Sequence, residues 1–165
     1  MESIEIKNFG PIKHVKLDLR DINVFIGPTA SGKSTVAKLV AIFKTSHSEK
    51  RSIDQFVALT ADYNIDFNIT EKTFIKYSYY DYYWEINKKE IVTNQDERSG
   101  LDFLGTNVNQ TVYIPAERNL LATIGQSIFG LMSNNVAIPM MVKHFGARFE
   151  YARKRVKQLS IDFLK

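Results

Sequence analysis

Residues 27 to 35 read GPTASGKST and set two glycines, a lysine and hydroxyl side chains at fixed spacing. The pattern is Gly-x-x-x-x-Gly-Lys-Ser, carried by Gly27, Gly32, Lys33 and Ser34. Glycines permit a tight turn in which consecutive backbone N–H groups point at one anion. A lysine adds a positive charge, and a serine hydroxyl is a suitable Mg²⁺ ligand. The stretch therefore predicts a loop that binds nucleotide phosphates.

Each residue type in this loop has an expected role. Lys33 should reach the β- and γ-phosphates and is the predicted catalytic residue. The Ser34 hydroxyl is the predicted metal ligand, and Thr35 is expected near the α-phosphate. ATP and Mg²⁺ are the expected cofactors. The predicted nucleotide-binding residues are Gly27, Pro28, Thr29, Ala30, Ser31, Gly32, Lys33, Ser34 and Thr35.

Two elements must hold the loop in place. Residues 22 to 27, INVFIG, are nearly all apolar and end in glycine, which predicts a buried strand that runs into the loop. Residues 33 to 46 carry apolar side chains at helical spacing, so a helix should begin at about Lys33 with its positive end facing the phosphates. A chance match in a glycine-rich turn would lack this strand and this helix.

Further strands and helices are expected on both sides of the loop. Residues 3 to 9 and 13 to 19 alternate around the turn GPI, which predicts an antiparallel hairpin. Residues 53 to 60 predict a short helix. The aromatic and β-branched runs from 63 to 93 predict an antiparallel meander, and residues 94 to 110 predict a surface loop.

The C-terminal part predicts mainly helices. Residues 111 to 115, TVYIP, predict a short strand, residues 118 to 133 a helix, and the chain from Pro139 onward one long helix. Its apolar residues recur in steps of four and three, which suits a helix packed on a core or the start of a coiled-coil arm. They are Ile138, Val142, Phe145, Phe149, Ala152, Val156, Leu159 and Phe163.

Composition excludes several classes of protein. The 165 residues include no cysteine, so disulfides and thiolate metal sites are excluded. No apolar stretch reaches the ~18 residues of a membrane span, and the N-terminus lacks the plan of a signal peptide. We therefore expect a cytoplasmic protein with no membrane partner. The net charge of +4 permits an anionic partner without demanding one.

The residues before the loop also carry a family resemblance. The stretch IEIKNFGPIKHVKLDLRDINVFIGPTASGKST resembles the N-terminal lobe of ABC-type ATPases. More narrowly, it resembles the SMC and overcoming-lysogenization-defect (OLD) group, often labelled AAA-family ATPases in bacteria. VYIPAERNLL is similar to a segment that recurs in bacterial members of this group.

The resemblance spans residues 3 to about 122 and implies a fold. That fold is an α/β P-loop NTPase with an ABC-ATPase-like N-terminal lobe, an antiparallel β-subdomain and a C-terminal helical segment. The expected division is a nucleotide-binding lobe at 1–122 and an incomplete helical subdomain at 123–165.

The resemblance further implies one site residue and several gaps. Where ABC ATPases have a glutamine that senses Mg²⁺, this chain has Ala116, followed by Glu117 and Arg118. Glu117 could take the catalytic role, or the pair could cap the next helix; both readings stay open. The metal-holding aspartate is missing, since Asp62 ends a predicted helix and no Asp-Glu pair closes a later strand. No serine-glycine signature follows, and His144 lies inside a predicted helix.

Three functions remain open at this stage. The first is the ATP-binding part of an ABC/SMC-like ATPase, completed by a missing C-terminal lobe or a homodimer partner, whose parent acts on DNA or in phage defence. This chain alone should bind ATP weakly to moderately and hydrolyse it very slowly. The second is a free-standing P-loop kinase of a small molecule. The third is a non-catalytic nucleic-acid-binding module that uses Arg153 and Arg155.

Overall fold

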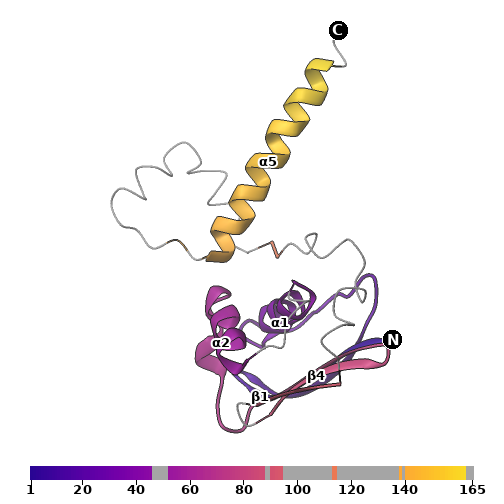
Figure 1. Ribbon diagram of the computed structural model, residues 1–165, viewed down its shortest axis with the longest axis vertical. Coiled ribbons are helices and arrows are strands. Elements are labelled where there is room, and N and C mark those ends of the chain that lie inside the picture. The colour runs from indigo at the N-terminus through magenta and orange to yellow at the C-terminus, as the bar shows by residue number, and fades with distance from the viewer. Residues whose placement is uncertain (46–51, 88–89, 95–112, 115–137, 139, 163–165) are drawn as a thin grey trace. The chain divides into compact units, whose positions relative to one another are not determined.

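The computed structural model describes residues 1–45, 52–87, 90–94, 113–114, 138 and 140–162 (Figure 1). The chain divides into two compact units, Met1–Thr111 and Val112–Lys165. The first unit contains a β-sheet with its helices, and the described part of the second contains a long helix.

The sheet of the first unit has five strands in the order β2-β1-β3-β4-β5, and every neighbouring pair is antiparallel. The predicted hairpin is confirmed as β1 and β2, and the later part of the predicted meander is confirmed as three strands. The strands are β1 (Glu2–Phe9), β2 (Ile12–Leu19), β3 (Phe74–Tyr79), β4 (Tyr82–Asn87) and β5 (Glu90–Thr93).

Alternation along the strands gives the sheet one apolar face and one polar face. Ile6 of β1 lies opposite Val15 of β2 and Ile75 of β3; Ile6 and Ile75 belong to the hydrophobic core, and Val15 packs against it. The neighbouring residue Glu5, whose side chain lies on the other face of the sheet, is opposite Lys16 and Lys76. Since side chains alternate between faces with a period of two, this register fixes which face is buried.

Two helices cover the apolar face (Figure 1). Helix α1 (Lys33–Thr45) buries Leu39, Ile42 and Phe43, and helix α2 (Ile53–Asp62) buries Phe56. Both helices agree with the sequence prediction. Helix α2 begins with a capping box, because the Ser52 hydroxyl accepts from the Gln55 N–H at 3.2 Å and the Gln55 side chain accepts from the Ser52 N–H at 3.1 Å.

The prediction of a buried strand at residues 22–27 is wrong for the structure as described. The segment is not a strand, and Ile22, Val24 and Ile26 are 82%, 76% and 92% exposed. A strand forms only where a neighbouring backbone supplies hydrogen bonds. The five described strands pair with one another, and none of them pairs with this segment. Its apolar composition therefore stands without a partner strand in the described part of the chain.

The first part of the predicted meander, residues 63–69, is also not a strand, and the prediction is wrong there. Helix α2 ends at Asp62, and Asn64 just beyond it has a positive φ of 53° and donates its N–H to the Ala61 carbonyl at 2.8 Å. The Ile65 N–H then reaches back to Thr60 at 2.9 Å, and a short 3₁₀ helix, η1 (Asp66–Asn68), follows. Asparagine tolerates the left-handed conformation, so it ends the helix in a turn and not in a strand.

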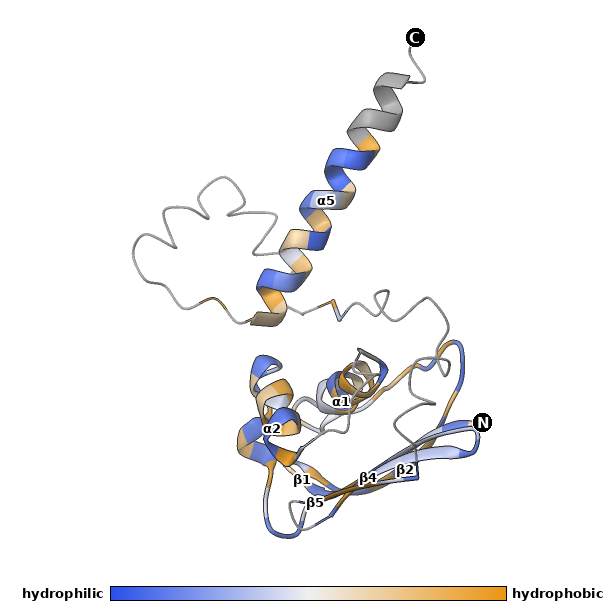
Figure 2. Cartoon of the chain, in the orientation of Figure 1, coloured by the Kyte–Doolittle hydropathy of each residue, from blue (hydrophilic) through white to orange (hydrophobic). Residues whose placement is uncertain are grey.

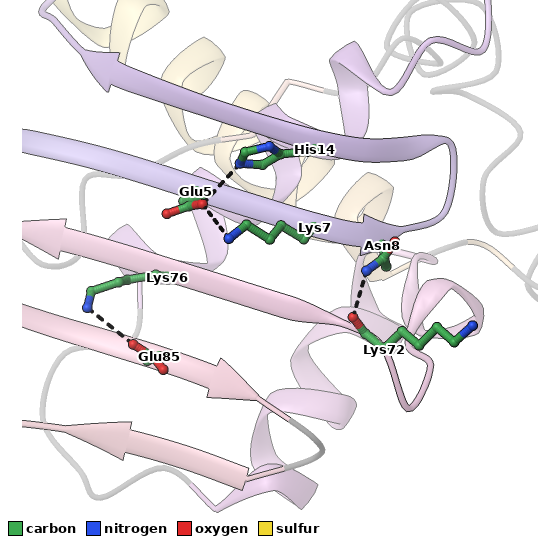
Figure 3. A network of polar contacts seen from close by, with 7 residues as sticks. All are labelled: Glu5, Lys7, Asn8, His14, Lys72, Lys76 and Glu85. Atoms are coloured by element: carbon green, nitrogen blue, oxygen red, sulfur yellow. Dashed lines mark hydrogen bonds and ion pairs between the residues drawn. The ribbon is translucent and has the colours of Figure 1, made fainter.

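The polar face of the sheet carries ion pairs between neighbouring side chains (Figure 3). The Glu5 carboxylate contacts the Lys7 ammonium at 2.8 Å and His14 Nε2 at 3.0 Å. Lys76 contacts Glu85 at 3.1 Å on the neighbouring strands. The hydrogen bond from Lys7 lowers the pKa of Glu5. Burial acts in the opposite direction, and the hydrogen bond with His14 lowers this pKa further. Such pairs are typical of a sheet face that meets solvent.

The second unit contains helix α5 (Met140–Asp162), which confirms the predicted long helix. Its buried residues Met141 and Val142 pack against Tyr113. The predicted helix at 118–133 lies outside the described residues, as do nearly all of the predicted loop at 94–110 and most of the strand at 111–115. No helix in the described residues is long and apolar enough to cross a membrane.

The core predicts a large effect for one aromatic substitution. The Phe43 ring stacks on Tyr77 with a centroid distance of 5.1 Å and an interplanar angle of 4°. Phe43→Ala should lower the free energy of unfolding by about 3–5 kcal/mol, measured by urea denaturation, because it removes a buried ring and leaves a cavity. Phe67→Ala is the matched control, since Phe67 is 72% exposed. Equal losses in the two variants would contradict this account of the core.

Candidate functional site

The segment before helix α1 forms a loop whose backbone alternates in hand. Ala30 has a φ of 61° and Gly32 a φ of 92°, while Thr29 and Ser31 keep negative φ values. Successive residues of opposite hand turn their N–H groups toward the same side, which creates a concave site for an anion. The loop is exposed from Gly27 to Ser31. It is thus neither stretched out nor covered.

The Lys33 ammonium lies inside the curve of this loop. Its Nζ donates to the Gly27 carbonyl at 2.8 Å, to the Pro28 carbonyl, and to the Ser31 hydroxyl at 3.2 Å. An ammonium has three N–H donors, so these contacts occupy all of them. The contact with Ser31 is the longest, and an arriving anion would take that donor with the smallest loss. The lysine is therefore tied to the start of the loop while it keeps one donor for exchange.

The β1–β2 hairpin packs against the loop at Gly32. A Cβ atom on Gly32 would lie 2.6 Å from Ile12 Cγ1 and 3.4 Å from Pro11 Cγ, and real Cβ atoms are essentially never found at the shorter distance. The positive φ adds a second requirement for glycine. At Gly27, in contrast, a Cβ would meet only the Ser31 hydroxyl at an ordinary 3.4 Å. Gly32 is thus the position at which the loop packs most closely against the hairpin.

Helix α1 directs its N-terminus at the same place. Its first hydrogen bond runs from the Val36 N–H to the Gly32 carbonyl at 2.9 Å. The N–H groups of the preceding first turn, from Lys33 to Thr35, have no intrahelical acceptor and carry the positive end of the helix dipole. The loop N–H groups, the ammonium and the helix end therefore all present positive charge to one site.

A pocket of about 590 Å³ extends from the loop along the hairpin. Ser31, Gly32 and Lys33 form its polar part at the loop, and Lys13 and His14 of β2 also line it. Its apolar walls include Ile12, Val15 and Leu17 of β2 together with Phe25 and Val36. A ligand with an anionic end and a flat, weakly polar body matches this division.

The structure brings together only part of the predicted site. Gly27, Pro28 and Ser31 surround the Lys33 ammonium, whereas Ser34 is exposed on the first turn of α1. Glu117 lies outside the described residues, so its role stays a prediction. Among the described residues, no group of three histidine, aspartate or glutamate side chains gathers that could hold a metal ion alone.

Sequence reasoning missed the contribution of the hairpin turn. Pro11 and Ile12 contact the position of Gly32, yet the motif GPI indicated only a turn. The contact joins residues twenty positions apart, and no local pattern announces it. The one available signal was the presence of a complete hairpin directly before the loop.

Comparison with known proteins assigns the chain to a family. Residues 1–135 match a family described as the AAA ATPase domain, and this range includes the hairpin, the loop and the described sheet. A comparison with curated proteins gave no match. The family match covers most of the chain and contains the concave loop, Lys33 and the pocket. On this basis the chain belongs to the family of the AAA ATPase domain.

Proposed function

We propose that this chain binds Mg·ATP through residues 27–35 as the N-terminal part of an ABC/SMC-like, OLD-like ATPase. Family membership implies nucleotide binding in general terms. The observation that supports the phosphate site is the Lys33 ammonium, which the carbonyls of Gly27 and Pro28 hold inside a loop of alternating hand. The narrower ABC/SMC-like, OLD-like assignment rests on the resemblance of the sequence.

The terminal phosphates would lie in the curve of the loop. One phosphate oxygen would replace the Ser31 hydroxyl as acceptor of Lys33, and others would accept from the N–H groups between Ala30 and Thr35. The negative charge of the phosphates then meets the ammonium and the helix end together. Mg²⁺, when bound, neutralises phosphate charge, and the Ser34 hydroxyl at the start of α1 would be its protein ligand.

The remainder of the nucleotide would lie in the pocket beside the hairpin. Its apolar walls, Ile12, Val15 and Phe25, suit the faces of a base, and Gly32 joins this part to the phosphate site. A base in this position would remove apolar surface of the pocket from water, which favours binding.

Hydrolysis should be very slow in this chain alone. Hydrolysis requires a carboxylate that holds the metal and a group that orients water. Asp62 ends helix α2, as the sequence predicted, and Glu117 is the remaining candidate. Efficient turnover would need a second protomer or a C-terminal lobe, and a role of the parent on DNA or in phage defence rests on the resemblance alone. The kinase alternative gains no support, because the described arginines that could form its lid lie along α5.

Loss of the ammonium should abolish nucleotide binding. Mg·ATP at ten times its Kd should stabilise the chain by about 1.4 kcal/mol. This stabilisation corresponds to a rise in Tm of about 5 °C. Lys33→Ala should remove the shift, whereas Lys16→Ala, on the polar face of the sheet, should keep it. Differential scanning fluorimetry with and without Mg·ATP measures both. A Lys33→Ala protein that retains the full shift would refute the proposed site.

A side chain at position 32 should damage the loop where a glycine at position 30 does not. Gly32→Ala should prevent binding of Mg·ATP in isothermal titration and lower the free energy of unfolding by more than about 1 kcal/mol, because of the contact with Ile12 and the positive φ. Ala30→Gly is the matched control and should bind Mg·ATP as the unmodified chain does, since the φ of 61° at position 30 suits glycine. Normal binding by Gly32→Ala would show that the hairpin does not set the loop.

A further inference from the structure

Helix α5 carries an apolar stripe that becomes exposed along its length. Val142 is 4% exposed and packs in the core of the second unit, whereas Phe149 is 47% and Val156 62% exposed. We call Phe145, Phe149, Ala152 and Val156 the α5 seam. Figure 2 shows the helix as alternating hydrophobic and hydrophilic segments. The described seam thus offers apolar surface over about three turns.

The spacing of the seam indicates what covers it. Its residues follow one another in steps of four, three and four, which average 3.5 residues per turn over a heptad. This spacing keeps a narrow stripe aligned with one second helix, whereas a helix on a broad core shows a wider apolar face. The rings of Phe145 and Phe149 already stack, with centroids 6.2 Å apart and planes at 28°. They form a ridge that can enter the side-chain holes of a second helix.

The residues beside the seam are positively charged. In the heptad numbering that puts Phe149 at position a, the flanking e and g positions hold Arg148, Arg153 and Arg155. From Met140 to Val156 the helix has five basic residues, Lys or Arg, and one acidic residue, Glu150. The Arg153 contact with Glu150 at 3.2 Å joins two side chains that are 57% and 48% exposed. Such a surface pair is weak, and Arg153 can turn to another acceptor.

These charges select the partner. A parallel pair of two α5 helices would set Arg148 of one copy beside Arg153 of the other, and like charges at these positions disfavour pairing. We propose that the α5 seam binds an amphipathic helix of a partner protein, in which a heptad apolar stripe is flanked by glutamate or aspartate. The apolar stripe supplies contact area, and the acidic flanks supply the choice of partner.

The test uses the full chain and two synthetic helical peptides. Both peptides carry leucine and isoleucine at positions a and d; one has glutamate at every e and g position, and the other has lysine there. Fluorescence anisotropy at moderate salt measures their binding. The glutamate peptide should bind at least tenfold more tightly than the lysine peptide, a preference that weakens as salt rises.

Matched variants separate the seam from the rest of the helix. Phe149→Ala should weaken binding of the glutamate peptide at least tenfold because it removes a central aromatic anchor. Tyr151→Ala, at an exposed position off the seam, should leave binding unchanged. Arg148→Glu with Arg155→Glu should reverse the preference toward the lysine peptide. Lys154→Glu, on the opposite side of the helix, should not reverse it. Circular dichroism checks that each variant keeps its helix.

Four results would overturn the inference. The first two are failure to bind either peptide and equal binding of both. The third is a chain that does not bind the glutamate peptide but self-associates in sedimentation, with self-association lost in Phe149→Ala. In that case a second copy of the chain would cover the α5 seam. The fourth is binding to duplex DNA that depends on the arginines but not on Phe149, with no peptide bound, which would assign the face to nucleic acid.

Discussion

The close approach of Gly32 to Ile12 is the constraint on which the candidate site depends. The backbone lies so near the side chain at the start of β2 that no Cβ atom fits between them. Ile12 is itself buried and belongs to the core between the sheet and helices α1 and α2. The position of the loop is therefore set by the hairpin and, through it, by the whole antiparallel sheet. A strand pair that precedes the loop in the sequence thus becomes the base on which the loop is built.

Local electrostatics then give the loop its chemical character. Ala30 and Gly32 turn backbone N–H groups toward one side, helix α1 adds its positive end, and the Lys33 ammonium is fixed by two carbonyls. None of these groups depends on a charged partner elsewhere in the described residues. Positive charge is gathered here without a cluster of basic side chains, which is why the modest net charge of the chain is compatible with an anion site.

Local signals in the sequence were enough for the hairpin, for α1 and α2, and for the loop-to-helix junction. Alternation and helical periodicity act between near neighbours and can be recognised in the sequence alone. Predictions failed where a distant or conformational factor decided. Residues 22–27 have strand composition, but a strand also needs a neighbouring backbone, and the described strands supply none. Asn64 forms a left-handed turn just after α2, whereas the residues around it have the composition of a strand. The contact between Ile12 and Gly32 had no sequence signal at all.

The central claim is that residues 27–35 hold the terminal phosphates of a nucleotide. A crystal structure of the chain with Mg²⁺ and a non-hydrolysable ATP analogue tests it most directly. The account predicts phosphate oxygens within hydrogen-bond distance of Lys33 Nζ and of the N–H groups that follow Ala30, with Ser31 released from the lysine. An analogue bound elsewhere on the chain, with Lys33 still donating to Ser31 and no phosphate in the loop, would contradict it.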